Sequence, residues 1–476
     1  MSSASDRQPN FLVIMTDQHF PGYSSAYGHP QAKTPAMDRL AREGVSFRQA
    51  YCNTPLCAPG RFSFMTGRYV HHHGAWDNAT PMPSDAVTWA HRLRATGYDV
   101  VLSGKMHFLG PDQLHGFRQQ LAIDLHAQQR HPIFAWDEAD GPTRAARPWR
   151  HPTESGVGRT SSTDADDQAE TAALAYLREP ARRDQPWALC VGLIAPNDPW
   201  IVPEPYFSMY YPDVELPTLP PGHLENLPPA ARVLRERHNM AGPFGDADVR
   251  RTRAAYFGMV TRVDEQIGRL LACLDDLGFA GNTVVVHTSD HGEMLGEHGL
   301  WRKSNFYEQS ERIPLQIRLP GGRFAGRWVE EPVSLVDLTA TILDLAGCRL
   351  ADDPDLALDG ISLLPALRGE APWRGEVFSE YLAHGNDRPR AMLRRDRWKL
   401  CYGYVKDGPP QLELYDLATD PGEFVNLANR PPYQEVQRDL LARLLSHWDP
   451  AAIHAAVTRS QRERLLIARA AGRETF

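Results

Sequence analysis

Residues 282–292 decide the fold of this chain, and they read Asn-Thr-Val-Val-Val-His-Thr-Ser-Asp-His-Gly. The apolar, β-branched run at 282–288 predicts a buried strand of a parallel sheet. Before it, apolar residues recur at helical spacing over 249–277 until Gly278, which predicts a helix that ends at the glycine. Asp290 and His291 stand just past the strand end, where open α/β sheets bind ligands.

The same alternation of helices and strands recurs through most of the chain. Thr34 and Pro35 mark the start of a helix and Gly44 its end. The other expected elements are strands at 11–16, 98–103 and 187–196 and helices at 86–96 and 164–177. We therefore expect an α/β fold with a large, mostly parallel sheet sandwiched by helices.

We place a domain boundary near residue 375, between a catalytic α/β domain at 1–375 and a C-terminal subdomain at 376–476. Within the first, 111–184 is rich in His, Gln, Asp, Arg and Pro and mostly irregular, which is typical of a functional insertion that contacts substrate. In the second, the sequence predicts a small antiparallel sheet with strands at 376–381 and within 392–404. Helices follow, the first of them at 433–448.

Composition excludes several classes of protein. The chain has 476 residues and a formal net charge of −8, which offers no basic surface to nucleic acid or to an anionic membrane. No apolar run approaches the ~20 residues that span a bilayer, and the polar start does not resemble a signal peptide, so we expect a cytoplasmic protein. The six cysteines are scattered in apolar segments and predict no disulfide framework.

Cys57 lies in the segment that is most informative about function, where residues 57–61 form the pattern Cys-x-Pro-x-Arg. Pro59 and Gly60 break the chain, and residues 61–66 predict the first turns of a helix. Cys57 would then lie near a helix N-terminus, where backbone N–H groups favour anions such as sulfate. A buried structural cysteine before a helix is the alternative.

Two acidic turns supply candidate metal ligands. Asp17 and Gln18 follow the strand at 11–16 in the way that Asp290 and His291 follow the later one. Both carboxylates would converge on one sheet edge, where a cation could neutralise the charge of an ester during cleavage. A helix-capping role for each aspartate is the alternative. The three histidines at 71–73 point in different directions, and we interpret them as structural.

Together these motifs resemble the signatures of the type I sulfatases. Residues 57–61 resemble the first signature and residues 288–303 the second. Further matching segments lie at 102–107, 110–117, 336–341, 412–416 and 420–427. The resemblance therefore covers nearly the whole chain and implies the alkaline-phosphatase-like fold. Within the family, the chain is most similar to the choline sulfatases, with some likeness to the phosphonate monoester hydrolases.

The resemblance implies catalytic roles for several side chains. Cys57 would be oxidised by formylglycine-generating machinery to Cα-formylglycine, whose hydrated aldehyde attacks sulfur. Arg61 would hold that hydrated aldehyde, and Lys303 would bind the sulfate. Lys105 and His107 would lie beside it, and His107 or a neighbour would take a proton from its second hydroxyl so that sulfate is expelled.

The resemblance also implies one bound divalent cation. Its ligands would be Asp17, Asp290, His291 and the modified Cys57, with Gln18 beside them. The imidazole moves the expected ion from Ca²⁺ toward Mn²⁺, because Ca²⁺ prefers sites made only of oxygen atoms.

Three positions affect the expected substrate. Asn197 stands where relatives carry the histidine of a Pro-His-x-Pro motif, and an amide cannot act as a cationic acid. General acid catalysis is worth ~10²–10⁴-fold, so we expect a preference for good leaving groups or the use of another acid. Trp136 remains the one candidate for a cation–π wall. Asn78, in a matching Asp-Asn pair, is the third expected substrate contact.

The sequence thus predicts a sulfuric ester hydrolase that cleaves a small-molecule sulfate monoester, either choline-sulfatase-like or arylsulfatase-like. A phosphonate monoester or phosphodiester hydrolase on the same scaffold is one alternative. A catalytically impaired protein that only binds sulfate esters is another, motivated by Asn197. We expect an assembly of identical chains, without a nucleic acid or membrane partner. The alcohol portion of the substrate and the metal stay open.

Overall fold

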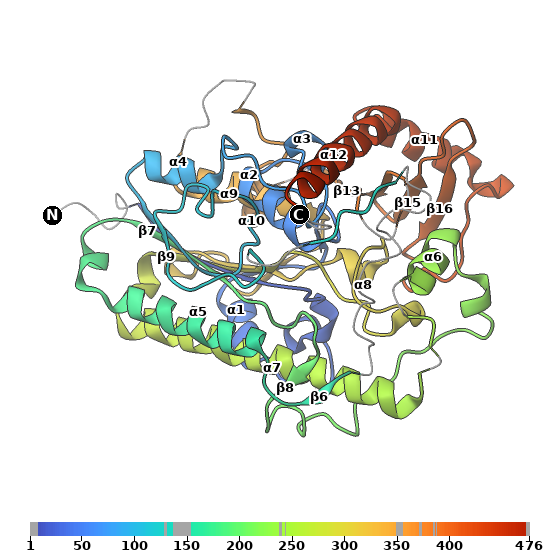
Figure 1. Cartoon of the computed structure of the whole chain (residues 1–476). Coiled ribbons are helices and arrows are strands. Elements are labelled where there is room, and N and C mark those ends of the chain that lie inside the picture. Colours follow the sequence, from blue (N-terminus) through green and yellow to red (C-terminus); the bar gives the residue numbers. More distant parts are fainter. Residues whose placement is uncertain are drawn as a thin grey trace.

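The structure is a computed structural model that describes residues 8–127, 131–136, 154–237, 240–242, 244–348, 356–370, 374–383, 386 and 388–472. It confirms the predicted α/β fold: a large sheet lies between two layers of helices, and a smaller sheet lies at one side (Figure 1). None of the described helices is both long and apolar enough to cross a membrane. All six cysteines are buried and free, as expected.

The large sheet has eight strands in the order β11-β2-β10-β9-β1-β7-β4-β5. Its central strands pair in parallel, and only β10 runs antiparallel to its two neighbours. The bounds are β1 (Asn10–Thr16), β2 (Val45–Phe47), β4 (Asp99–Gly104), β5 (Gln119–Gln120), β7 (Trp187–Gly192), β9 (Thr283–Ser289), β10 (Leu315–Arg318) and β11 (Arg327–Val329). Every residue of β1, β4, β7 and β9 is buried, as in a sheet covered on both faces.

Alternate residues of β1 face the two hydrophobic cores. Leu12 and Ile14 pack in a core with α1 (Pro35–Glu43), α5 (Ser161–Arg178) and α7 (Asp246–Asp276). Phe11, Val13 and Met15 pack in the other core, with α2 (Cys57–Thr66), α4 (Trp89–Ala95) and α9 (Leu335–Leu345). Figure 1 shows α5 and α7 on one side of the sheet and α2, α4 and α9 on the other.

Two expected elements differ in their bounds. The helix predicted at 86–96 begins only at Trp89, because the Thr88 side chain accepts a hydrogen bond from the His91 N–H and caps the helix there. The strand region at 392–404 is a hairpin of β14 (Arg390–Arg395) and β15 (Trp398–Gly403). Asp396 adopts a left-handed backbone conformation (φ 53°) in the turn between them.

The C-terminal part carries a four-stranded antiparallel sheet in the order β13-β14-β15-β16 and then α11 (Gln434–Leu445). Its outer strands are β13 (Glu376–Tyr381) and β16 (Gln411–Asp416). Its core also includes Tyr69, Val70 and Val336 from the large α/β unit. The two parts therefore share one packed interface, and the boundary near residue 375 stays a prediction.

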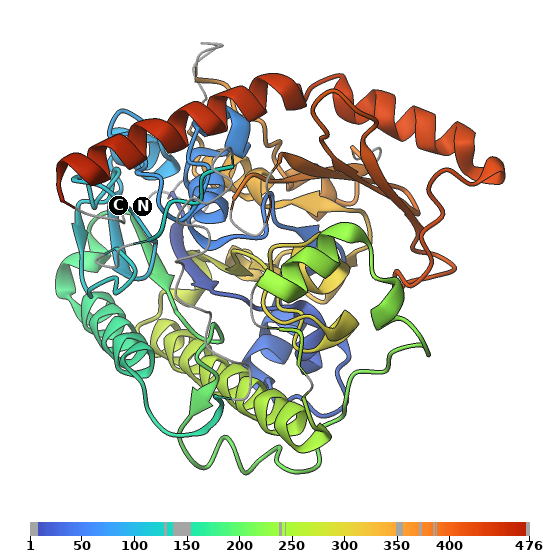
Figure 2. The same ribbon diagram turned by 45° about the vertical axis from the view of Figure 1, so that its right-hand side comes forward.

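The last helix, α12 (Pro450–Ala470), runs back across the large unit (Figure 2). Asp449 caps its start by accepting hydrogen bonds from two backbone N–H groups. Arg464 then forms a two-bonded ion pair with Asp77, with N···O distances of 2.8 and 3.0 Å. Leu465 and Ala468 pack in a small core with Ala79, Ile133 and Ala135. Helix α12 is thus fixed against segments that adjoin Cys57 and His107.

Candidate active site and metal centre

Four potential ligands converge at the carboxyl ends of β1 and β9. In the parallel pairing of these strands Thr16 lies opposite Ser289, so Asp17 and Asp290 leave adjacent strand ends side by side. One ligand atom from each of Asp17, Cys57, Asp290 and His291 lies within 4.8 Å of each of the others, and all four residues are buried. We call these residues the four-ligand cluster. The expected convergence of both acidic turns on Cys57 is confirmed.

Helix α2 begins at Cys57 itself, so the prediction that the helix starts at residue 61 was wrong. Its first helical hydrogen bond runs from the Gly60 N–H to the Leu56 carbonyl. Pro59 fits in this first turn because N–H groups there have no intrahelical partner to lose. Asn78 accepts a hydrogen bond from the Ala58 N–H at 3.0 Å, which ties the predicted substrate residue to the helix start.

Cys57 Sγ points into the cluster. It lies 3.3 Å from His291 Nε2 and 3.8 Å from Asp17 Oδ1. Asn197 Nδ2 is 3.9 Å from the same sulfur and donates a hydrogen bond to Asp17 Oδ1. Asn197, an expected substrate contact, therefore lies beside the four-ligand cluster.

Arg61 connects the two carboxylates. It donates to Asp290 Oδ2 at 2.9 Å and to Asp17 Oδ2 at 3.1 Å, and also to the backbone carbonyls of Lys105 and Thr16. Its side chain is fully buried. Burial opposes its charge, but Asp290 and Asp17 outweigh burial and raise its pKa. The expected role of Arg61, holding a hydrated aldehyde, stays a prediction, because these four bonds go to carboxylates and to the backbone.

The pKa values of Asp17 and Asp290 are shifted in opposite directions. Burial favours the neutral form of Asp17, but Lys105, Arg61 and His291 hold its pKa well below the usual range. Burial and the nearby charge of Asp17 raise the pKa of Asp290 to about 7. Even with Arg61 bonded to both, these two carboxylates do not both ionise freely, and a further cation between them would reduce their repulsion.

Two lysines add positive charge to the site. Lys105 Nζ lies 2.6 Å from Asp17 Oδ2. Lys303 donates to the side-chain carbonyl of Gln18; burial opposes its charge, but Cys57 and Asp17 raise its pKa. Gln18 has a left-handed backbone (φ 66°) and donates to Glu293 at 2.6 Å. Its carboxamide therefore connects Lys303 to Glu293, and its expected place beside the metal stays a prediction. Sequence reasoning missed Glu293, although it directly follows the Asp-His-Gly turn.

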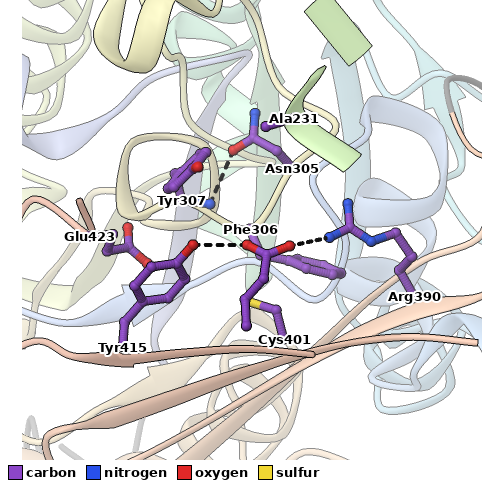
Figure 3. Close-up of a pocket in the computed structure, with 9 residues that line it drawn as sticks. Ala231, Asn305, Phe306, Tyr307, Arg390, Cys401, Tyr415 and Glu423 are labelled. Carbon is purple, nitrogen blue, oxygen red and sulfur yellow. Dashed lines mark hydrogen bonds and ion pairs between the residues drawn. The ribbon is translucent and has the colours of Figure 1, made fainter. Parts of the chain in front are cut away.

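The loop that carries Lys303 is held by the small sheet (Figure 3). The Asn305 side chain accepts a hydrogen bond from the Tyr307 N–H at 3.0 Å. Arg390 of β14 lies over the Phe306 ring, 5.4 Å from its centroid. Arg390 also donates to Glu413, which accepts a second bond from the Tyr415 hydroxyl. The C-terminal sheet thus supports one side of the site.

His107 lies in the loop after β4 in a left-handed conformation (φ 63°). Asp124 accepts hydrogen bonds from the backbone N–H groups of Met106 and His107 and holds this turn. The His107 ring contacts two histidines that sequence reasoning missed, His126 and His131. The only signal for them was the high histidine content of residues 111–184.

Trp136 lies against α12. Its backbone N–H donates to Gln461 at 3.0 Å, and its ring stacks on His454 with centroids 5.7 Å apart. Its role as a cation–π wall stays a prediction.

The three consecutive histidines have separate partners, as expected of structural residues. His71 contacts Glu380, His72 contacts Asp359 and His73 contacts Ser63.

Comparison with known proteins places this site in a family. The family model described as "Sulfatase" matches residues 9–348, and the model described as "N-sulphoglucosamine sulphohydrolase, C-terminal" matches residues 296–449. The chain is 36% identical to a choline-sulfatase of Rhizobium meliloti over 97% of this chain and 91% of that protein. It is 31% identical to the multifunctional alkaline phosphatase superfamily protein PehA of Trinickia caryophylli, over 94% and 97%. Among solved structures, the phosphonate monoester hydrolase of Agrobacterium radiobacter superposes with a TM-score of 0.76 at 28% identity, over 94% and 96%.

Proposed function

Since the chain belongs to the sulfatase family, we propose that it cleaves a small-molecule sulfate monoester to an alcohol and sulfate. The observation that carries the proposal is the four-ligand cluster with three cationic side chains around it. Arg61, Lys105 and Lys303 place three positive charges around Cys57 and the two carboxylates of the cluster. A buried positive site favours a tetrahedral anion.

The donors of the cluster fit a divalent cation. Asp17 and Asp290 offer carboxylate oxygens and His291 offers Nε2, all directed toward Cys57. This mixture of oxygen and imidazole nitrogen suits Mn²⁺ or a similar ion, and the two carboxylates also suit Ca²⁺. When bound, such an ion supplies Lewis-acid stabilisation of negative charge on the reacting oxygens.

We also propose that Cys57 is converted to Cα-formylglycine. Hydrated, that residue supplies one hydroxyl for attack on sulfur and a second whose deprotonation expels sulfate. A cysteine or serine has no second hydroxyl, so it would stay sulfated after the first half of the reaction. The Cys-x-Pro-x-Arg pattern and the position of Cys57 at the start of α2, facing His291, support this.

The neighbouring side chains have distinct tasks in this reaction. Arg61 keeps both carboxylates oriented. Lys105 and Lys303 bind sulfate oxygens, and His107 removes the proton of the second hydroxyl. Asn197 donates a hydrogen bond but no proton, so the departing alcohol receives no cationic acid from this position.

A phosphonate monoester or phosphodiester hydrolase is the second candidate, and the superposition with the Agrobacterium radiobacter enzyme favours it. These esters have the tetrahedral geometry and single negative charge of a sulfate monoester, so site charge alone does not separate the two classes. A panel of choline sulfate, aryl sulfates, sugar sulfates and phosphonate esters tests the choice. We expect the highest kcat/KM with a sulfate ester. A higher value with a phosphonate would overturn the proposal, and no turnover of any ester would favour a binding protein.

Two measurements test the chemistry behind this choice. Mass spectrometry of the Cys57 peptide should show the aldehyde, and the Cys57→Ala variant should be inactive. A pure thiol in fully active protein would refute formylglycine. In addition, Asn197→His should accelerate alkyl sulfates more than nitrophenyl sulfate, because an alkoxide needs a proton and an aryl oxide does not. Equal effects on both would show that another group supplies the acid.

A further inference from the structure

Three histidine rings pack together beside Lys105. The His107 ring is fully buried, and its centroid lies 5.1 Å from that of His126 and 5.0 Å from that of His131. The Nε2 atoms of His107 and His131 are 3.2 Å apart. His126 and His131 lie outside the motifs that identified the other site residues, so those motifs assign no role to either histidine.

The segment that carries His131 is fixed from its far side by α12. Ile133 and Ala135 are buried against Leu465 and Ala468. The next residue, Trp136, donates its backbone N–H to the Gln461 side chain. His131 is therefore held next to His107 by a packed helix, as the orientation of a catalytic ring requires.

The hydrogen bonds of this pair decide which nitrogens carry protons. The Nε2 atoms of His107 and His131 face each other at hydrogen-bond distance, so one of them carries a proton and donates it to the other. A proton on Nδ1 of His107 would find no acceptor among the described residues, whereas a proton on its Nε2 finds one in Nε2 of His131. A neutral His131 ring then carries its own proton on Nδ1. His107 then donates through Nε2, and its Nδ1 carries a lone pair. That Nδ1 is buried and, among the described residues, has no hydrogen-bond partner.

We infer that His131 is a positioning residue that makes His107 a base through Nδ1 and then receives its Nε2 proton. This inference rests on the function proposed above. When Nδ1 of His107 takes a proton from a hydroxyl, an N–H bond forms there, and the Nε2 proton of His107 moves to Nε2 of His131. His107 ends neutral and His131 ends as an imidazolium. The charge thus moves from a fully buried ring to a partly exposed one, from which the proton passes to water.

The surrounding charges are compatible with this transfer. Burial lowers the pKa of both rings, and Lys105 acts in the same direction, so both are neutral near pH 7 and able to accept a proton. The charges of Asp77 and Asp124 favour the charged form of His131, whereas His131, Lys105 and His126 oppose charge on His107. Asp17 faces His107 and favours its charged form.

Substitution of His131 tests the relay. His131→Phe keeps a ring of similar shape without nitrogen, and His126→Phe is the matched control because it removes the other neighbouring ring. We expect kcat to fall at least about tenfold in His131→Phe, with KM changed less than about twofold, and a much smaller loss in the control. Added imidazole should restore turnover to His131→Ala but not to His126→Ala. Equal losses in both Phe variants, or no rescue, would overturn the inference.

A second readout needs no turnover. Nitrogen NMR of the protein labelled with ¹⁵N-histidine, with His107→Gln and His131→Gln used for assignment, reports the tautomer of each ring. We expect a proton on Nε2 of His107 and on Nδ1 of His131, and the opposite tautomers would refute the relay. If no ester is hydrolysed, the proposed function fails, and the tautomers still decide whether the histidine pair is arranged as inferred.

Discussion

Replacement of Arg464 by methionine should destabilise the protein, because it leaves Asp77 as a buried charge without its cation. The two side chains are 6% and 3% exposed, and two hydrogen bonds join them. Methionine keeps an apolar stem in the same place. Removal of one partner from a buried ion pair costs about 3–5 kcal/mol.

The remaining contacts of Asp77 place the loss at the lower end of that range. The Ala79 N–H and the Thr80 hydroxyl still donate to Oδ1, at 2.9 and 2.8 Å. With an unfolding entropy of about 2 cal/mol/K per residue, a chain of this length gives about 1 kcal/mol/K. A loss of about 3 kcal/mol therefore lowers Tm by about 3 °C.

The pH dependence of Tm tests whether the loss of stability comes from the unpaired charge of Asp77. Burial opposes the charge of Asp77, but Arg464 holds the pKa of Asp77 below its usual value. The ion pair therefore stabilises the fold at pH values above the pKa of Asp77 in the unfolded chain, and this stability is lost as pH falls through its pKa in the folded protein. Without Arg464, burial raises the pKa of Asp77, so Asp77 becomes protonated as pH falls and the variant no longer holds an unpaired buried charge. The Tm gap between Arg464→Met and the unmodified protein should thus narrow from pH 8 to pH 5.

Thermal unfolding followed by circular dichroism at several pH values measures this gap. The double variant Asp77→Asn, Arg464→Met lacks both charges and should recover most of the lost stability. A Tm change below 1 °C, a gap independent of pH, or a double variant no more stable than the single one would each refute the reasoning.

Three further outcomes follow from other parts of the structure. Burial raises the pKa of Glu311 from its ordinary 4.5 to about 8 in the folded protein. The stability that the neutral carboxyl contributes is complete below the unfolded pKa and is lost as pH rises through the folded pKa. The Tm of Glu311→Gln should therefore exceed that of the unmodified protein by an amount that grows from pH 5 to pH 9, and a difference independent of pH would contradict this. Gly192→Ala should lower stability and activity, because the added Cβ would lie 1.8 Å from the Lys105 carbonyl oxygen. Gly281→Ala is the control, since its Cβ would have nothing within 4 Å. Equal Tm values for the two variants would disprove the close approach at Gly192. Chelation should lower both Tm and turnover, and one divalent ion per chain should restore them, because the carboxylates of the four-ligand cluster repel each other without a cation; no change on chelation would remove the metal from the proposed function.

The parts of the site that sequence reasoning predicted are those that local patterns encode. Asp17 and Asp290 were predicted because each follows an apolar strand, and neighbouring parallel strands end at the same sheet edge. Helix α7 and strand β9 were predicted because periodicity and β-branching are local signals. The start of α2 was missed because proline was taken as a break, although it is compatible with a first turn.

Contacts between distant segments had no such signal. Arg464 is 387 positions from Asp77, and nothing near either residue indicates the other. His126 and His131 lie in an irregular region without periodicity, so their convergence on His107 depends on packing against α12. The same holds for the support that the small sheet gives to the loop carrying Lys303.

The burial of Cys57 sets a time limit on its proposed oxidation. In the folded chain the residue is 4% exposed, and every residue of α2 is buried, so an enzyme could not reach the sulfur. About 420 residues of the sequence follow Cys57, and their synthesis alone takes about 20–80 s at ~5–20 residues per second. The turn after β9, which carries Asp290 and His291 beside the thiol, comes from that later part. If Cys57 is converted as proposed, conversion therefore precedes the folding of residues 57–61, and variants that delay folding should be converted more completely rather than less.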